Sequence, residues 1–588
     1  MTAWRARGRR LGRRLQVFFL RATSHPRIPD KVALIVLAVL IGLGTGAAFI
    51  VFVRLLQMTT WVAFEGGRRA LAVLGPYHVI LLPALGGLVV GPLISRFVHE
   101  AKGSGVPQVM RAIVLHGGRM RARVAPGKLV ASAITVGSGG SAGTVGPMVQ
   151  VGAGLGSAVG QFLKASDDRI RTFVACGAAA GLAATLNAPI AGAIFSLEVL
   201  IGHFSGDFAL VVLASVSSAV ISRAALGNFP SFAVPPYDLI SEKELIFYAG
   251  LGLLAAGAAT AFVRIMYALE EFFEGWRAPD WVKPAMGGLF VGGLGYFLPQ
   301  VYGTGFPAME AALEMRLSLL LLLFLGLGKI LGTSLTLGSG GSGGVFAPSL
   351  FIGGMVGGSW GTIVHHFFPS FTAFSGAYAL VGMGATFGAA AQAPLTGILL
   401  LFEMTNDYRI ILPLMLATIL STVLYRALDP ESIYTRKLKR WGVTVAAGRD
   451  MDIMASTPVA TALTHRLLAV PPEMPIRDFQ LAVEREEHDW FPVVNGTGEL
   501  VGVMTAQDAD QATERGEDDV PVDRYMTRDI LSVTPLDSLQ EVIRRFGMRD
   551  LGHLPVVDPG NPRRLVGIIS RLHVLRAYDR ELARRRDR

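Results

Sequence analysis

Three short motifs rich in glycine and proline have the composition expected of an anion-binding backbone. They are Gly103–Pro107, Gly143–Pro147 and Gly344–Pro348. In each motif a glycine precedes a proline, and proline is favoured in the first turn of a helix. The N-terminus of a helix presents N–H groups without a partner and a partial positive charge. The motifs therefore predict helix N-termini that coordinate a small anion through the backbone, without the tighter hold of a fixed lysine.

The same glycines could instead serve only the close packing of helices, because small residues let backbones approach one another. One such motif alone would favour that interpretation. Three motifs in one chain, two of them related by an internal repeat, favour anion coordination.

Much of the first half of the membrane-like sequence recurs about 200 residues later. Four segments recur in the same order: Gly103–Pro107 as Gly303–Pro307, Lys128 as Lys329, Gly137–Pro147 as Gly338–Pro348, and Asn187–Glu198 as Gln392–Glu403. Repeats of this kind place a substrate site at their interface, near the middle of the bilayer. The sequence leaves open whether the repeats are parallel or inverted.

The segments that must position these motifs are apolar enough to lie in a membrane. The chain of 588 residues is 51% hydrophobic and only 17% charged, and its mean hydropathy is +0.48. The uncharged stretch Val32–Val53 is long enough to cross a bilayer. Further apolar runs follow: Val79–Ser95, Phe208–Ser222, Leu245–Val263, Leu317–Gly328, Phe371–Phe402 and Ile410–Tyr425. Several are broken by Gly or Pro, which membranes tolerate only where the backbone lines a cavity enclosed by protein.

The rest of the composition limits the chemistry. The single cysteine, Cys176, excludes a disulfide framework and a cysteine metal cluster. Since the sequence offers no nucleophile–base pair, metal cluster or phosphate loop, we predict neither an enzyme nor a metal site. Six arginines between Arg5 and Arg14 crowd the basic segment 1–30. Such a run resembles a targeting peptide or a nucleic-acid arm, but beside a membrane domain it predicts a cytoplasmic N-terminus and no nucleic-acid partner.

After Trp441 the sequence becomes charged, which predicts a soluble domain extending to Arg588. Two pairs of apolar strands in this part recur: Phe491–Val494 and Leu500–Val503, then Leu554–Val557 and Leu565–Ile568. Helical stretches flank them, such as Ser538–Arg549 with apolar residues at helical spacing. The C-terminal part is therefore predicted to be one α/β module present twice.

The membrane motifs, in this order, resemble the CLC family of chloride channels and chloride/proton exchangers, from about Arg27 to Trp441. The resemblance implies an all-α, inverted-repeat fold over residues 31–441, with repeats of about 31–225 and 243–441. It also implies an integral, multi-pass protein of the plasma or inner membrane, in contact with lipid, with both termini cytoplasmic. The family forms homodimers with one pore per subunit.

The resemblance also assigns the anion sites. In the family the central chloride is held by a serine and a tyrosine hydroxyl, which match Ser104 and Tyr434, and by backbone amides, which match those of Val345 and Phe346. The outer anion site, at the gate, would use the amides around Val145 and Gly146. Lys128 matches a family lysine near the pore, where it would supply a positive potential; snorkelling from a helix end is an equal alternative.

Two positions depart from the family pattern. The family motif Gly-Arg-Glu-Gly-Pro is Gly-Thr-Val-Gly-Pro here, so Val145 replaces the glutamate that gates the pore and carries the proton. A second family glutamate, which passes protons inward, is Val199. Because exchange needs titratable groups along the path, we predict a passive chloride channel. The alternative is a chloride/proton antiporter in which His203 or Glu198 carries protons, although Glu403 repeats Glu198 and so favours a structural role for it.

The C-terminal repeats resemble a pair of CBS domains, at 452–515 and 521–580. Such pairs often bind an adenine nucleotide, whose ribose contacts a Ser/Thr-x-x-Asp pattern. The first module has it as Thr505 and Asp508, whereas the second ends in His573. A purely structural or dimerising pair is the equal alternative, and no other cofactor is predicted. A third hypothesis is a nucleotide-sensing membrane protein without transport, and the intact set of Ser104, Tyr434 and Gly344–Pro348 argues against it.

Overall fold

The computed structural model describes residues 30–202, 208–227, 240–405, 407–443, 454, 456–464, 469–483, 490–549 and 552–586. The arginine run at the N-terminus and His203 lie outside these ranges. The chain forms two compact units, Met1–Val445 and Ala446–Arg588.

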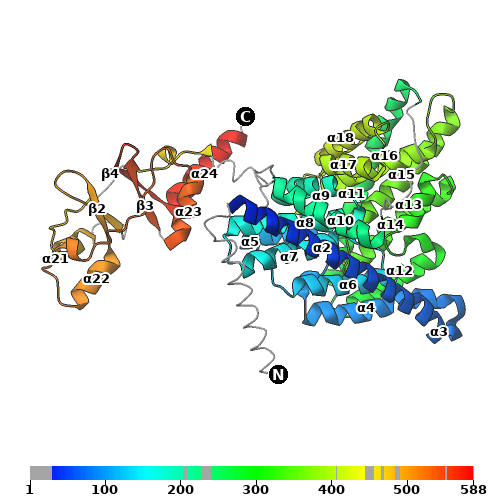
Figure 1. Cartoon of the computed structure of the whole chain (residues 1–588), viewed down its shortest axis with the longest axis horizontal. Coiled ribbons are helices and arrows are strands. Elements are labelled where there is room, and N and C mark those ends of the chain that lie inside the picture. The colour runs from blue at the N-terminus through cyan, green and yellow to red at the C-terminus, as the bar shows by residue number, and fades with distance from the viewer. Residues whose placement is uncertain are drawn as a thin grey trace. The chain divides into compact units, whose positions relative to one another are not determined.

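Among the described residues of the first unit, the regular elements are helices joined by loops (Figure 1). Its first half contains α2 (Asp30–Thr60), α3 (Gly67–Ala70), α4 (His78–Arg96), α5 (Val106–His116), α6 (Val124–Gly137), α7 (Val145–Phe162), α8 (Asp167–Leu186), α9 (Pro189–Phe195) and α10 (Phe208–Leu226). Its second half contains α11 (Leu245–Gly275), α12 (Lys283–Phe297), α13 (Phe306–Leu313), α14 (Leu319–Gly338), α15 (Phe346–Phe367), α16 (Ser375–Ala391), α17 (Pro394–Thr405), α18 (Ile411–Leu428) and α19 (Thr435–Arg440).

Six stretches of helix among the described residues are long and apolar enough to cross a membrane: Lys31–Ala70, Gly75–Arg96, Phe208–Leu226, Glu242–Gly275, Leu319–Gly338 and Ile411–Leu428. Helices α6, α9 and α17 are apolar but shorter. By length and composition, the first unit therefore has the helices that a multi-pass membrane protein requires.

Hydropathy alone places some helix ends incorrectly. The apolar run Leu245–Val263 predicts a shorter helix than α11, which continues to Gly275. The reason is that its last turns carry carboxylates that pair with cations of α19. Likewise α14 continues past the apolar run to Gly338 because Lys329 is buried and hydrogen-bonded within the protein. The run Phe371–Phe402 is two helices, which are separated at Gln392 by a left-handed backbone (φ 53°).

The two halves are related by reciprocal contacts. The Gly143 N–H donates to the Gly344 carbonyl at 2.8 Å, and the Gly344 N–H donates back to the Gly143 carbonyl at 2.6 Å. The Ser141 N–H donates to the Thr336 hydroxyl, as the Ser342 N–H does to the Thr135 hydroxyl. Each of these hydrogen bonds in one half has an equivalent in the other half. The two halves are therefore related by a local two-fold axis. This axis passes between the two matching glycine motifs.

The second unit contains two hairpins in separate two-stranded sheets. Strand β1 (Trp490–Val494) pairs antiparallel with β2 (Leu500–Thr505), and β3 (His553–Asp558) pairs antiparallel with β4 (Asn561–Ser570). The helices of this unit are α21 (Ile476–Val483), α22 (Ala506–Glu514), α23 (Leu539–Arg549) and α24 (Arg571–Arg586). Thr464, which precedes the first hairpin, exchanges two backbone hydrogen bonds with Ile568 of β4. The duplicated α/β module predicted from the sequence is therefore present.

Candidate anion pathway

The loops that precede the motif helices meet at the local two-fold axis. The Gly103 N–H donates to the Gly341 carbonyl at 3.0 Å, and the Gly343 N–H donates to the Gly103 carbonyl at 3.2 Å. The Ala142 N–H donates to the Gly303 carbonyl at 3.2 Å. The structure thus brings all three predicted anion-binding motifs together, with the fourth, related loop beside them.

Glycine is required where these loops cross. A Cβ atom on Gly146 would lie 2.3 Å from the Ser104 carbonyl oxygen and 3.0 Å from the Cα atom of Gly344. Both neighbours are backbone atoms and cannot rotate away. The close approach places Gly146 of the outer-site motif against Ser104 and Gly344 of the central-site motifs. The two predicted anion sites are consequently adjacent.

The motifs end at the starts of helices, as the sequence predicts. Val145 is the first residue of α7, Phe346 is the first residue of α15, and Gly105 precedes α5 with φ at 94°. The first four N–H groups of a helix lack intrahelical partners. Val145, Val345 and Phe346 are each at most 2% exposed. Their amides therefore supply donors and a partial positive charge in a dry environment.

Tyr434 is fixed from two sides. It lies directly before α19 and is 1% exposed. Its ring meets the edge of Phe195, with ring centroids 6.3 Å apart, and Phe195 in turn meets Phe346 at 6.1 Å. The preceding residue, Ile433, donates its N–H to a carbonyl of α16 and accepts a hydrogen bond of 2.6 Å from the Tyr267 hydroxyl. Tyr434 is therefore held beside the N-terminus of α15, as a central-site ligand requires.

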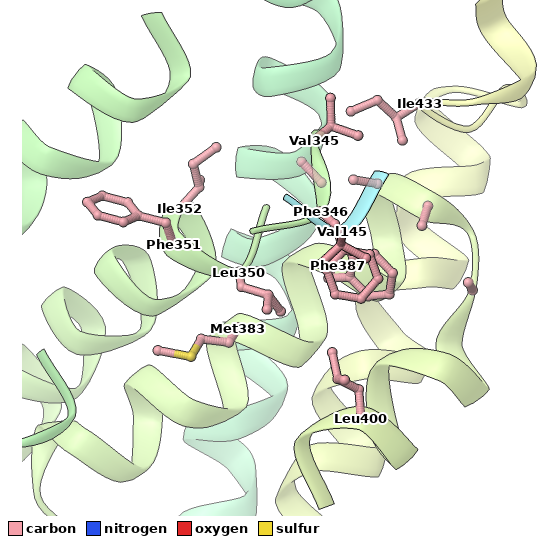
Figure 2. Packing of buried hydrophobic residues seen from close by; sticks show 14 of the residues in the cluster. Val145, Val345, Phe346, Leu350, Phe351, Ile352, Met383, Phe387, Leu400 and Ile433 are labelled. Atoms are coloured by element: carbon pink, nitrogen blue, oxygen red, sulfur yellow. The ribbon is translucent and has the colours of Figure 1, made fainter. Parts of the chain in front are cut away.

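Figure 2 shows part of the buried apolar core around the start of α15. Val145, Val345, Phe346, Phe387 and Ile433 are labelled in it, and the ring centroids of Phe346 and Phe387 are 4.0 Å apart. These residues belong to one continuous buried core, which also contains Tyr434.

Ser104, unlike Tyr434, borders a cavity. It is half-buried and lines a cavity of about 370 Å³ between α5, α11, α12 and α19. Gly103 and Pro107 of the same motif also line this cavity. The Ser104 loop therefore borders a cavity large enough to hold several water molecules.

Val199 lies in the helical turn Ser196–Ile201 that follows α9. It is half-buried and packs against the large apolar core. Neither Val145 nor Val199 has a side chain that titrates. The two positions assigned to proton-carrying glutamates are therefore both apolar.

Lys128 does not snorkel from a helix end, which was one of its two sequence-based interpretations. Its ammonium group is fully buried and donates to the carbonyls of Ala101 at 3.0 Å and Gly103 at 2.6 Å. Lys329 makes the same two bonds to Val301 and Gly303 in the second repeat. A snorkelling lysine would extend toward solvent, whereas Lys128 points inward and ties down the loop that carries Ser104. Its effect on pore potential stays a prediction.

The carboxylates of the third repeated motif are exchanged between the halves. Glu198 accepts hydrogen bonds from the N–H groups of Leu395 and Thr396, at the start of α17. Glu403 accepts hydrogen bonds from Ile190 and Ala191, at the start of α9. Each carboxylate caps a helix of the other repeat. This geometry agrees with the structural role that the repeat predicts for Glu198.

The predicted nucleotide-binding residues form a helix cap. The Asp508 carboxylate accepts hydrogen bonds from the N–H (3.0 Å) and hydroxyl (2.7 Å) of Thr505, and its own N–H donates to the Thr505 hydroxyl. In the second module the Ser570 N–H donates to Nδ1 of His573 at 3.3 Å, and the His573 N–H donates to the Ser570 hydroxyl. Burial, together with Arg576, lowers the pKa of His573 and so favours the neutral ring that can accept this bond.

Several residues around the site escape sequence analysis. Tyr267 and Phe195 position Tyr434, but nothing in their sequence neighbourhood marks them, and the residue related to Phe195 by the repeat is Leu400. The carboxylates Glu270 and Glu274 also line the cavity. The sequence could have pointed to these two residues. Acidic residues in the last turns of a long apolar helix are energetically costly in a membrane and so often have a functional role.

Comparison with known proteins agrees with this architecture. Residues 86–426 match the family model described as voltage gated chloride channel, and residues 453–512 and 522–580 each match that of the CBS domain. A ClcB-like chloride channel protein of Ralstonia nicotianae is 34% identical over 415 residues, which are 69% of this chain and 97% of that protein. The H⁺/Cl⁻ exchange transporter ClcA of Yersinia pestis is 31% identical over 70% of this chain and 88% of that protein.

Two solved structures share the fold. A slow cyanobacterial Cl⁻/H⁺ antiporter superposes with a TM-score of 0.63 at 28% identity, over 69% of this chain and 97% of that chain. A eukaryotic CLC transporter superposes with a TM-score of 0.63 at 19% identity, over 92% of this chain and 97% of that chain. The predicted all-helical, inverted-repeat membrane domain with a C-terminal CBS pair is confirmed. The chain belongs to the CLC family of voltage-gated chloride channels and transporters, and it is an integral, multi-pass membrane protein that transports anions.

Proposed function

We propose that this chain conducts chloride passively, without moving protons. The observation that carries the proposal is the position of Val145 at the first turn of α7, where it is 1% exposed and belongs to the large buried apolar core. This position corresponds, by the family resemblance, to that of the gating glutamate, which supports the proposal. A valine can neither compete with chloride for the backbone donors nor bind a proton, and Val199 removes the inner carboxylate as well.

A chloride/proton exchanger is the second candidate, and the names of the similar proteins favour it. The Yersinia pestis relative is named an H⁺/Cl⁻ exchange transporter, and the structure at 28% identity is of a Cl⁻/H⁺ antiporter. The Ralstonia nicotianae relative is instead named a chloride channel protein. Similarity over the whole membrane domain thus supports exchange, whereas the two residues most directly concerned with protons support conduction.

Purified protein in liposomes distinguishes the two. We expect that an outward chloride gradient drives chloride efflux with no proton uptake beyond that of protein-free liposomes. The reversal potential under opposed gradients should follow chloride alone, because neither Val145 nor Val199 can carry a proton. Proton uptake in a fixed ratio to chloride efflux, or chloride accumulation driven by a pH gradient, would establish the exchanger instead.

We further propose that the protein acts as a homodimer with cytoplasmic termini and that the first CBS module binds an adenine nucleotide. The family resemblance supports the dimer, and the arginine run supports the orientation. Thr505 and Asp508 support the nucleotide site, since a capping carboxylate retains lone pairs that can accept hydrogen bonds from ribose hydroxyls.

The Asp508→Ala variant should weaken binding of ATP, ADP or AMP to the full-length protein. Loss of a charged acceptor predicts a dissociation constant roughly 10-fold or more higher. His573→Ala is the matched control, because it removes the equivalent helix cap in the second module without removing a carboxylate. Calorimetry that finds no adenine nucleotide bound by the wild-type protein would leave a purely structural pair.

A further inference from the structure

The cavity that leads to Ser104 is nearly balanced in charge. Pathways for anions are expected to have a positive potential, which concentrates the ion at the entrance. Here the lysines of the wall face carboxylates: Lys283 lies 2.8 Å from Asp280, and both Lys102 and Lys437 contact acidic residues of α11. The other two charges in the wall, Arg111 and Glu100, are also opposite in sign. The formal charges of the wall therefore cancel.

Glu274 occupies the central place in this arrangement. It lies at the end of α11 with 44% of its side chain exposed, 3.8 Å from the ammonium group of Lys102 and 3.6 Å from that of Lys437. Lys102 comes two residues before Ser104, and Lys437 comes three residues after Tyr434. One carboxylate thus neutralises cations on both segments that carry the proposed side-chain ligands of the anion.

Glu270, one turn earlier, has a different environment. Its side chain is only 10% exposed, forms an ion pair with Lys437 and lies 3.7 Å from Arg440. A buried carboxylate with two cationic partners fastens α19 to α11, and its removal would leave uncompensated buried charge. Lys437 is only 15% exposed, but it keeps its ion pair with Glu270 when Glu274 is replaced. The remaining pair, Glu274 with Lys102, is more than a third exposed on both sides. Surface pairs of that kind contribute little to stability.

We propose that Glu274 limits the rate at which anions enter the pathway by neutralising Lys102 and Lys437 at the wall of the cavity. The inference rests on the anion pathway through Ser104 proposed above, but not on the absence of proton coupling. Anion entry is slower with the carboxylate present, and the restraint weakens as salt screens Glu274 and Lys102, which are both more than a third exposed. The Debye length falls from about 30 Å at 0.01 M salt to about 3 Å at 1 M.

The test measures chloride flux through the full-length protein in liposomes, at constant gradient and at two ionic strengths. Glu274→Gln should raise the flux by about two- to fivefold near 10 mM salt and leave it at the wild-type level near 1 M. Lys102→Gln should lower the flux at 10 mM, since it removes one of the cations, and Glu274→Asp should stay close to wild type.

Glu271→Gln is the matched control. Glu271 lies on the same turn of α11, but its side chain is 77% exposed, contacts Arg440 at 3.7 Å and is not part of the cavity wall. The variant changes the net charge by the same amount without changing the cavity. A Glu274→Gln flux equal to that of Glu271→Gln at 10 mM, a lower flux, or a gain that persists at 1 M would each overturn the inference. Proton coupling in the same liposomes would overturn passive conduction and leave this inference standing.

Discussion

The Val145→Glu variant is expected to conduct chloride at least about tenfold more slowly than the wild type at neutral pH. Val145 is the first residue of α7, so a side chain there lies beside the N–H groups that are proposed to form the outer anion site. A carboxylate would occupy these donors in place of chloride. An advantage of only about 1.4 kcal/mol over the permeating ion is enough for a tenfold effect.

Acid should relieve the block in this variant. Protonation removes the negative charge of the new side chain and frees the donors, so flux through Val145→Glu should rise as the pH falls. Coupled exchange should still be missing, because Val199 leaves no carboxylate at the inner proton position. Chloride efflux from liposomes at several pH values, with the wild type in parallel, measures both effects.

Val145→Gln is the control for size. Its side chain has nearly the same shape as glutamate but no titratable proton, so any steric obstruction that it causes should be independent of pH. The gate assignment requires added pH dependence in Val145→Glu and none in Val145→Gln. A Val145→Glu protein that conducts like the wild type at every pH would show that Val145 does not lie at the gate.

The sequence predicts the parts of the site that depend on the backbone. Gly143–Pro147 and Gly344–Pro348 are recognisable because a helix start of this kind needs glycine for close approach and proline for the first turn. The repeat predicts that they meet, and the reciprocal hydrogen bonds of Gly143 and Gly344 show that they do. The order of repeated motifs can therefore predict contacts between distant segments, which composition alone cannot.

The sequence does not predict which side chains from other segments hold the site residues in place. Phe195, Tyr267 and Tyr434 come from three separate segments, and only their packing shows that the first two hold the third. The two interpretations of Lys128 failed to include hydrogen bonds to Ala101 and Gly103, because a sequence does not show which carbonyls a bent loop leaves unpaired. A buried lysine can satisfy such carbonyls with its three donors.

Helix ends were uncertain for a related reason. An apolar run ends where charge begins, but α11 continues because its terminal carboxylates find cationic partners on α19. Glu274, one turn after Glu270, also pairs with Lys437 of α19 and lines the cavity. A hydropathy profile ends a membrane helix where charged residues begin. Those charged residues can nevertheless continue the helix and line the cavity, as they do in α11.

Removal of the two proposed ligand hydroxyls should change which anions the protein prefers. Ser104→Ala and Tyr434→Phe each delete one donor and little else, since the Tyr434 ring can keep its contact with Phe195. A hydrogen bond to a charged group contributes roughly 1.5–3 kcal/mol. Each variant should therefore raise the dissociation constant for chloride by roughly 10- to 150-fold. The permeability ratios of bromide, nitrate and chloride should shift as well, because weakly hydrated anions depend less on the lost donor.

Ser334→Ala provides the matched control for this change. Ser334 lies on α14, and its hydroxyl is buried with no hydrogen-bond partner among the described residues. Its deletion removes a buried hydroxyl from the same domain without removing a proposed ligand, so chloride affinity and permeability ratios should match the wild type. Isothermal titration of chloride and bi-ionic reversal potentials give the two readouts. If both Ser104→Ala and Tyr434→Phe retained wild-type ratios, the central anion would be held by the backbone of α15 alone, and the hydroxyls would have only a structural role.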